Sequence, residues 1–112
     1  MTGLDLMNRM SDLTRMLDSS VSAFARRGKE YAQAEHDYKV AMAEKVLLLR
    51  TDGYPVTIIP DLARGDKNVA RLRLDRDIKE VSYKAAGEAI QSYKLQMRIL
   101  QDQIEREWGD AK

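Results

Sequence analysis

The first half of the sequence carries a heptad pattern that few folds can accommodate. From about Leu4 to Thr51 there is no proline, and apolar or small residues recur at alternating steps of three and four. This spacing keeps one face of an α-helix apolar, as in helices that pack lengthwise against a partner. We therefore predict one helix over about residues 4–52. Its apolar seam consists of Leu6, Met10, Leu13, Leu17, Ser20, Phe24, Tyr31, Ala34, Tyr38, Ala41 and Leu48.

The stretch Asp52-Gly53-Tyr54-Pro55 predicts the end of this helix. A glycine can adopt the left-handed conformation that closes many helices, and a proline cannot continue the helix. The following residues are apolar at first and end at Gly65. We predict that residues 53–66 form the turn and a short capping segment over the end of the helix.

A second helix is predicted over about residues 67–108, with Asp66 or Asn68 as its N-cap. A second apolar stripe lies beside its seam, so this helix is apolar over a wider arc than one partner helix would cover. Either the capping segment or another subunit must pack there. The seam consists of Val69, Leu72, Arg76, Lys79, Tyr83, Ala86, Ile90, Tyr93, Met97, Leu100 and Ile104, and the second stripe of Leu74, Ile78, Val81, Ala85 and Ala89.

The two seams predict an all-α fold: a single coiled-coil-like antiparallel helical hairpin with a short capping segment at its turn. Aligning the seams directly across the turn places Tyr38 opposite Tyr83 and Leu17 opposite Ile104. In this register the second helix ends, near Trp108, before it has covered the whole first helix.

The predicted register therefore leaves the first turns of the first helix without an intramolecular partner. Exposed apolar patches of this kind mark interfaces. Two antiparallel helices also form a thin core, which further helices commonly complete. We predict a homo-oligomer, most simply a dimer that forms a helical bundle. The predicted partner or oligomer contacts are Leu4, Leu6, Met7, Met10 and Trp108.

The composition excludes several classes of protein. Charged residues make up 33% of the chain and aromatic residues 6%, which suits solvated helices better than a β-sandwich. The absence of cysteine excludes disulfides, thiolate metal sites and a cysteine nucleophile. No stretch reaches the ~20 apolar residues of a membrane span, and the N-terminus lacks the features of a secretory signal. We therefore expect a cytoplasmic protein without membrane contact.

Residues suited to catalysis are sparse. His36 is the only histidine, and a general base or a metal site would need further groups converging on it. The acidic residues alternate with basic ones at a spacing of four, as in Asp102 and Arg106, which is typical of exposed helix pairs. We predict no catalytic, cofactor-binding or metal-binding residue, and hence no enzyme.

The densest basic stretch lies at the start of the second helix. The net charge of the chain is only +1, which argues against a protein that mainly wraps duplex DNA. The basic stretch could nevertheless contact nucleic acid or an acidic protein surface. Alternatively, these side chains only solvate the helix. The predicted contact residues are Arg64, Lys67, Arg71 and Arg73.

Four motifs distinguish the second half of the chain. They are Gly53-Tyr54-Pro55-Val56-Thr57-Ile58-Ile59, Val69-Ala70-Arg71-Leu72-Arg73 with Arg76-Asp77, Tyr83-Lys84-Ala85, and Lys94-Leu95-Gln96-Met97-Arg98-Ile99-Leu100 with Ile104-Glu105-Arg106-Glu107-Trp108. In these motifs the chain resembles small helical proteins, without an established activity, that phages and prophages of Gram-positive bacteria encode in early or DNA-metabolism regions. The resemblance covers about residues 31–108. It implies a role inside the bacterial host cell and supplies no functional residues.

These observations lead to two functional hypotheses. The first is a non-enzymatic, phage-related interaction protein, an inhibitor or adaptor that binds a host or phage protein through helical surfaces. The alternative is a nucleic-acid-binding accessory of phage DNA replication or recombination.

Overall fold

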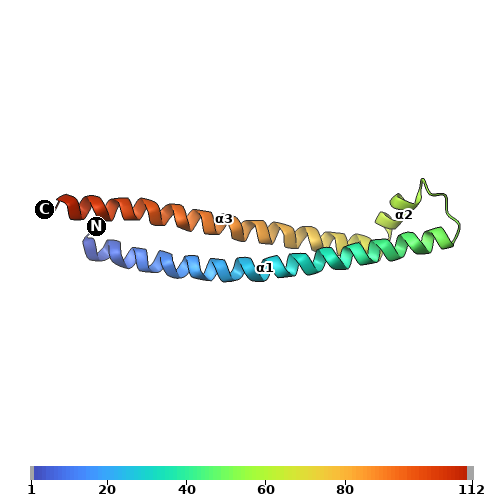
Figure 1. Ribbon diagram of the computed structural model, residues 1–112, viewed down its shortest axis with the longest axis horizontal. Helices are drawn as coiled ribbons and strands as arrows, with labels where there is room; N and C mark the ends of the chain where they lie inside the picture. The colour runs from blue at the N-terminus through green and yellow to red at the C-terminus, as the bar shows by residue number, and fades with distance from the viewer. Residues whose placement is uncertain (1, 111–112) are drawn as a thin grey trace. The chain divides into compact units, whose positions relative to one another are not determined.

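The computed structural model describes residues 2–110 as three helices: α1 (Gly3–Thr51), α2 (Ile59–Gly65) and α3 (Lys67–Asp110). Helices α1 and α3 run side by side in opposite directions, and α2 lies in the connection between them (Figure 1). The predicted all-α antiparallel hairpin with a short capping segment is confirmed. The predicted ranges 4–52 and 67–108 differ from the observed helix bounds by at most two residues.

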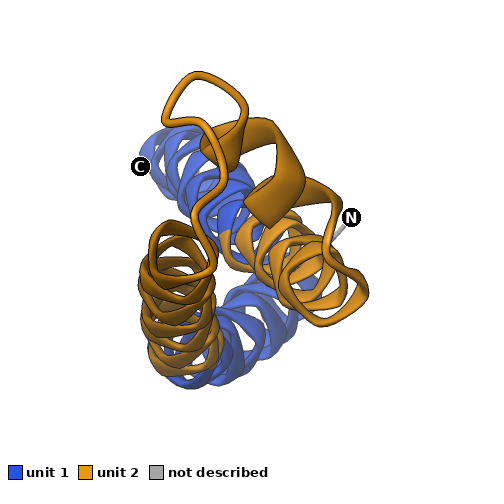
Figure 2. Cartoon of the chain, turned by 90° about the vertical axis from the view of Figure 1, so that its right-hand side faces the viewer, with its two compact units in different colours: residues 1–26, 84–112 blue, residues 27–83 orange. Residues whose placement is uncertain are grey.

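The chain divides into two compact units, coloured separately in Figure 2. Unit 1 contains residues 1–26 and 84–112, and unit 2 contains residues 27–83. Each unit therefore combines a segment of α1 with a segment of α3. Unit 2 also contains α2 and the turn.

Local capping interactions explain where α1 begins and ends. At its start, the Asp5 N–H donates to Thr2 Oγ1 (3.1 Å) and the Thr2 N–H donates to Asp5 Oδ2 (3.2 Å), a reciprocal capping box. Hydrogen bonds from the side chain and the backbone N–H of Thr2 lower the pKa of the Asp5 carboxyl. At its end, Gly53 has a φ of +84°, and the N–H groups of Gly53 and Tyr54 donate to Arg50 and Leu49. This Schellman pattern confirms the predicted glycine stop.

Asp66, rather than Asn68, is the N-cap of α3. Its Oδ2 accepts hydrogen bonds from the backbone N–H groups of Asn68 and Val69, each at 3.1 Å. Its Oδ1 lies 3.4 Å from Lys45 Nζ of α1. The bond from Val69 is the main cause of a lowered pKa at Asp66, and Lys45 adds to it. One carboxylate thus starts α3 and ties that start to α1.

The core of unit 1 is aliphatic. Leu6, Leu13 and Leu100 are each at most 6% exposed and form one buried cluster. Farther along the same unit, the Phe24 ring lies against Gly87, where a Cβ atom would come within 3.1 Å of it. The partly buried residues around the leucine cluster are Met10, Tyr93, Met97 and Ile104.

Unit 2 has an aliphatic cluster only under its cap. Ile59 and Ala63 of α2 are buried against Leu49 of α1. A small separate core therefore forms where α2 packs on α1 next to the turn, which confirms the predicted cap. Met42 and Val46 complete this cluster.

The rest of the seam in unit 2 mixes the buried aliphatic residues Ala34 and Val69 with aromatic and polar side chains. Tyr31 and Tyr83 stack with ring centroids 5.9 Å apart, and the Arg76 guanidinium lies 4.7 Å from the centre of the Tyr38 ring. Arg27 Nη1 donates to the Ser82 carbonyl at 3.3 Å. These contacts depend on direction as well as on volume.

The predicted pairing of the seams was wrong, although their composition was right. Tyr83 was expected opposite Tyr38 but lies against Gly28 and Tyr31. The pairing is displaced by about two helical turns, or one heptad. The physical reason is α2, which covers the last turns of α1 so that α3 begins only opposite Lys45.

The displaced register also corrects the predicted overhang. Leu6 and Met10 were expected to project into water, but Leu6 is only 3% exposed and Met10 packs beside it. Because α3 begins farther back along α1, its end reaches the first turns of α1. Leu100 and Ile104 pack with Leu6 and Met10, contacts that are absent from the predicted register.

Candidate interaction surfaces

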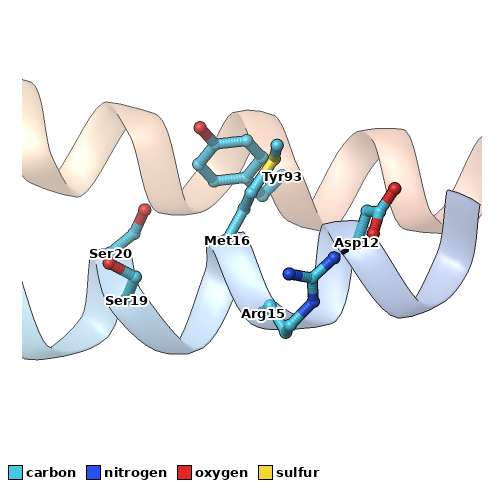
Figure 3. A pocket seen from close by; sticks show the side chains of 6 residues that line it. All are labelled: Asp12, Arg15, Met16, Ser19, Ser20 and Tyr93. Carbon is cyan, nitrogen blue, oxygen red and sulfur yellow. Dashed lines mark hydrogen bonds and ion pairs between the residues drawn. The ribbon is translucent and has the colours of Figure 1, made fainter.

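A hollow in unit 1 is lined by residues of both α1 and α3 (Figure 3). Asp12 and Arg15, at one end of it, form an ion pair with each other. Their side chains are 74% exposed at Arg15 and 46% exposed at Asp12, so this is a solvated ion pair on the surface of α1. Its lining residues are Asp12, Arg15, Met16, Ser19, Ser20 and Tyr93.

His36 lies on the surface of α1. Its side chain is 70% exposed, and Nδ1 is 3.4 Å from Asp37 Oδ1. Bonds from Gln33 and His36 lower the pKa of Asp37. Within residues 2–110, no group of three or more histidine, aspartate or glutamate side chains is arranged to hold a metal ion. The geometry around His36 is that of a solvated helix residue.

The four basic residues predicted to contact nucleic acid do not converge. Arg71 and Arg73 are both exposed on α3 but only two residues apart, so they point to nearly opposite sides of the helix. Lys67 shares the side of Arg71, because it is four residues away. Arg64 belongs to α2, where it pairs with Asp61 at 3.1 Å.

Acidic side chains within the basic stretch form ion pairs with some of its basic side chains. Arg76 bonds to Asp77 at 2.7 Å, and this bond raises the pKa of Arg76. Lys79 bonds to Asp75 at 3.0 Å. The start of α3 therefore presents alternating charges rather than one positive surface.

The apolar tip, as we name the surface around the turn of unit 2, is its most prominent feature. It comprises six large apolar side chains within residues 47–62, each at least 40% exposed. The spacing of the sequence predicts the capping segment, but it does not predict that much of this segment is exposed. Helix α2 buries Ile59 and Ala63 on one side and leaves Leu62 exposed, while the other residues of the tip lie in the last turns of α1 and in the turn. The apolar tip consists of Leu47, Leu48, Tyr54, Val56, Ile58 and Leu62.

A groove lies next to the apolar tip and shares two residues with it. Tyr54 and Leu62 line it together with the buried Leu49. Its charged wall includes Lys45 and Asp66, the residues that join α1 to the start of α3. The groove thus combines an apolar floor with a charged rim, as protein-binding surfaces commonly do.

The outer side of α3 is a second apolar surface. In unit 2, Leu74, Ile78 and Val81 are 61%, 58% and 69% exposed. Their spacing places them on one side of α3, opposite its seam. Helix α2 does not cover them, so the interpretation that the cap packs there is wrong. We name these three residues the outer patch of unit 2.

Unit 1 repeats this arrangement on its own part of α3. Leu95 and Ile99 are each 53% exposed and lie on the side opposite the seam. We name them the outer patch of unit 1. The corresponding positions of α1 in this unit are polar, namely Asp12, Arg15, Ser19, Ser22 and Arg26.

Of the five residues predicted to contact a partner or a second subunit, three have exposed side chains. Leu4 and Met7 are exposed on α1, and Trp108 is exposed on α3. The indole Nε1 of Trp108 lies beside Gly3, 3.7 Å from where its Cβ atom would be. The observed register brings the end of α3 to this position.

Comparison with known proteins adds no relative. No protein-family model, curated protein or solved structure matches this chain. Across the described residues, no helix is long and apolar enough to cross a membrane.

Proposed function

We propose that the protein is a non-enzymatic interaction protein that binds a partner protein through the apolar tip of unit 2 and acts as a homodimer. The observation that carries this proposal is the concentration of six exposed apolar side chains within residues 47–62. Apolar surface of this density is costly in water and is typical of a surface that a partner covers. The groove beside Tyr54 and Leu62 offers a place for an apolar anchor.

The resemblance to phage and prophage proteins supports a partner from the phage or from its bacterial host. In that setting an inhibitor or adaptor needs only a stable scaffold and one complementary surface. The helical hairpin provides the scaffold, since each unit has a buried aliphatic cluster of its own.

Affinity capture with matched variants tests the proposal. The tagged protein is incubated with nuclease-treated lysate of a Gram-positive host, and retained proteins are identified by mass spectrometry. We expect a protein in near-stoichiometric amount with the wild type and its loss with the double variant Leu47→Glu, Val56→Glu. The control Ser19→Glu, Ser22→Glu adds the same charge to the polar outer side of α1. Equal retention by all three proteins, or none by the wild type, would contradict the proposal.

The alternative, a nucleic-acid accessory that uses Arg64, Lys67, Arg71 and Arg73, makes a different prediction. Binding should weaken linearly with the logarithm of salt concentration, with a slope set by the phosphates contacted. The double variant Arg71→Ala, Arg73→Ala should reduce that slope. A flat salt response would remove this alternative.

A further inference from the structure

We infer that the outer side of α3 pairs with α3 of a second copy in antiparallel orientation, so that the outer patch of unit 2 in one protomer covers the outer patch of unit 1 in the other. Leu74 then lies opposite the partner's Ile99, and Ile78 lies opposite the partner's Leu95. The inference rests on the dimer of the proposed function and assigns its surface and its orientation.

The spacing of the two patches supports a second helix on this side of α3. From Leu74 the outer positions continue at alternating steps of four and three to Ile99. Six of these eight positions are apolar, as in a helix–helix seam on the side away from α1, and only Glu88 and Ser92 interrupt them. The outer positions are Leu74, Ile78, Val81, Ala85, Glu88, Ser92, Leu95 and Ile99.

Charge complementarity identifies the second helix as another copy of α3. The outer patch of unit 2 has a carboxylate on each flank, Asp75 and Asp77, whose side chains are 45% and 49% exposed. Both hydrogen bonds from Arg76 to Asp77 end on Oδ1. The acidic flanks of this patch are therefore accessible to a basic partner surface.

The outer patch of unit 1 supplies that basic surface. Arg98 flanks Ile99 on one side, and on the other side Ile99 borders a groove whose rim includes Arg9. The floor of this groove contains the buried Leu13 and Leu100. It offers an apolar recess for Leu74 of the second copy, with guanidinium groups on both flanks.

Only the antiparallel orientation uses this complementarity. It places Asp77 on the same flank as the partner's Arg98 and within one helical turn of it, and it places Arg71 opposite the partner's Asp102. A parallel pair would set each of these residues against its own like-charged equivalent, which is unfavourable. A two-fold axis also doubles every contact, because each protomer contributes both patches.

Cysteine cross-linking tests the inference cleanly, because the chain contains no cysteine. Leu74→Cys and Ile99→Cys are prepared as separate proteins and oxidised alone and as a mixture. In the antiparallel dimer the two cysteines introduced at position 74 are roughly 37 Å apart along the helices, far beyond disulfide reach. We expect disulfide-linked dimers in the mixture and none with either protein alone.

Other cross-linking outcomes have distinct meanings. Links in each protein alone but not in the mixture would show a parallel pair and overturn the inference. If no links form but analytical ultracentrifugation shows a dimer, the interface lies on another surface. That result would overturn the inference but not the dimer of the proposed function. A monomer at micromolar concentration would overturn both the dimer and this inference, whereas capture through the apolar tip would be judged by its own experiment.

Two substitutions on this side of α3 provide an independent readout. Ile78→Glu should raise the dimer dissociation constant at least about tenfold, because the carboxylate would be buried in the interface. Val40→Glu, on an exposed apolar residue of α1 in the same unit, should change it less than about twofold. Glu88→Leu fills a polar position of the seam and should tighten the dimer about tenfold. Equal effects of Ile78→Glu and Val40→Glu would contradict the assignment.

Discussion

The two units solve the same packing problem with different chemistry. Unit 1 joins α1 to α3 through leucines that fill volume, with Leu13 only 1% exposed. Unit 2 also buries Ala34 and Val69 between the same two helices, but it adds a tyrosine stack, an arginine over Tyr38 and the Lys45–Asp66 ion pair. Aliphatic layers can slip by a heptad at little cost, whereas directional contacts cannot. We conclude that unit 1 supplies much of the cohesion and unit 2 fixes the register.

The largest effect should come from the core of unit 1. Leu13→Ala should reduce the free energy of unfolding by about 3 kcal/mol, because it removes a fully buried side chain and leaves a cavity. Urea denaturation followed by circular dichroism measures this change. Leu13→Met, which conserves volume, should cost less than about 1.5 kcal/mol.

Leu4→Ala is the matched control, since Leu4 is 71% exposed on the same helix. It should change the free energy of unfolding by less than about 0.5 kcal/mol. Similar losses for Leu4→Ala and Leu13→Ala would mean that the aliphatic cluster does not hold unit 1 together.

A smaller effect is expected from the directional contacts of unit 2. Arg76→Ala should cost about 1 kcal/mol, because it removes the contact with the Tyr38 ring and the packing of the long side chain. Arg76→Lys should recover only part of this loss, since an ammonium lacks the planar group that lies over the ring. Full recovery by lysine would show that charge alone matters at this position.

Alkaline pH should weaken unit 2 through Tyr31. Burial is the main cause that raises the pKa of Tyr31, and Glu35 and Glu80 add to it. A raised pKa in the folded state contributes stability below the unfolded value of about 10, and this contribution is lost as pH rises through the folded pKa. Between pH ~8 and pH ~11 the wild type should lose more thermal stability than Tyr31→Phe. Equal losses of thermal stability in the wild type and in Tyr31→Phe would show that Tyr31 is not the cause of the alkaline destabilisation.

The smallest effect should come from the cap of α3. The lowered pKa of Asp66 contributes stability above the unfolded value of about 4, and this contribution is lost as pH falls through the folded pKa. Asp66→Asn keeps a capping side chain but not the charge beside Lys45. Its melting temperature should lie below that of the wild type at pH ~7, and the difference should vanish below pH ~3.

The sequence predicted the face of each helix and the helix ends with good accuracy. All predicted seam residues of α3 are buried or half-buried, and on α1 only Leu48 is exposed, with Leu49 buried in its place. The helical period determines which residues share a face, so these features follow from spacing alone. The stop at Gly53 follows from local chemistry in the same way.

The register could not be predicted, because a heptad repeat looks the same after a shift of seven residues. What selects one register is how far α2 covers the end of α1, together with the directional contacts of residues such as Arg76 and Tyr83. These depend on three-dimensional geometry that spacing does not contain. The misplaced overhang at Leu6 and Met10 was a direct consequence.

The candidate surfaces were predicted only in part. The sequence indicated that apolar residues such as Leu74 and Ile78 exceed what one partner helix can cover, and they are exposed. It did not reveal the apolar tip, because exposure at the end of α1, in the turn and in α2 depends on how these segments fold around Leu49. The basic stretch looked continuous in sequence, yet helical geometry separates Arg71 from Arg73.

The short α2 cluster has a consequence for the order of folding. Its contacts, and that between Lys45 and Asp66, join residues close in sequence, whereas Trp108 reaches Gly3 from the other end of the chain. Closing a short loop loses less chain entropy than closing a long one. We expect the two helices to pair first near the turn and then progressively toward the termini. The leucines near the termini would then pack last, in the register that the contacts near the turn have already set.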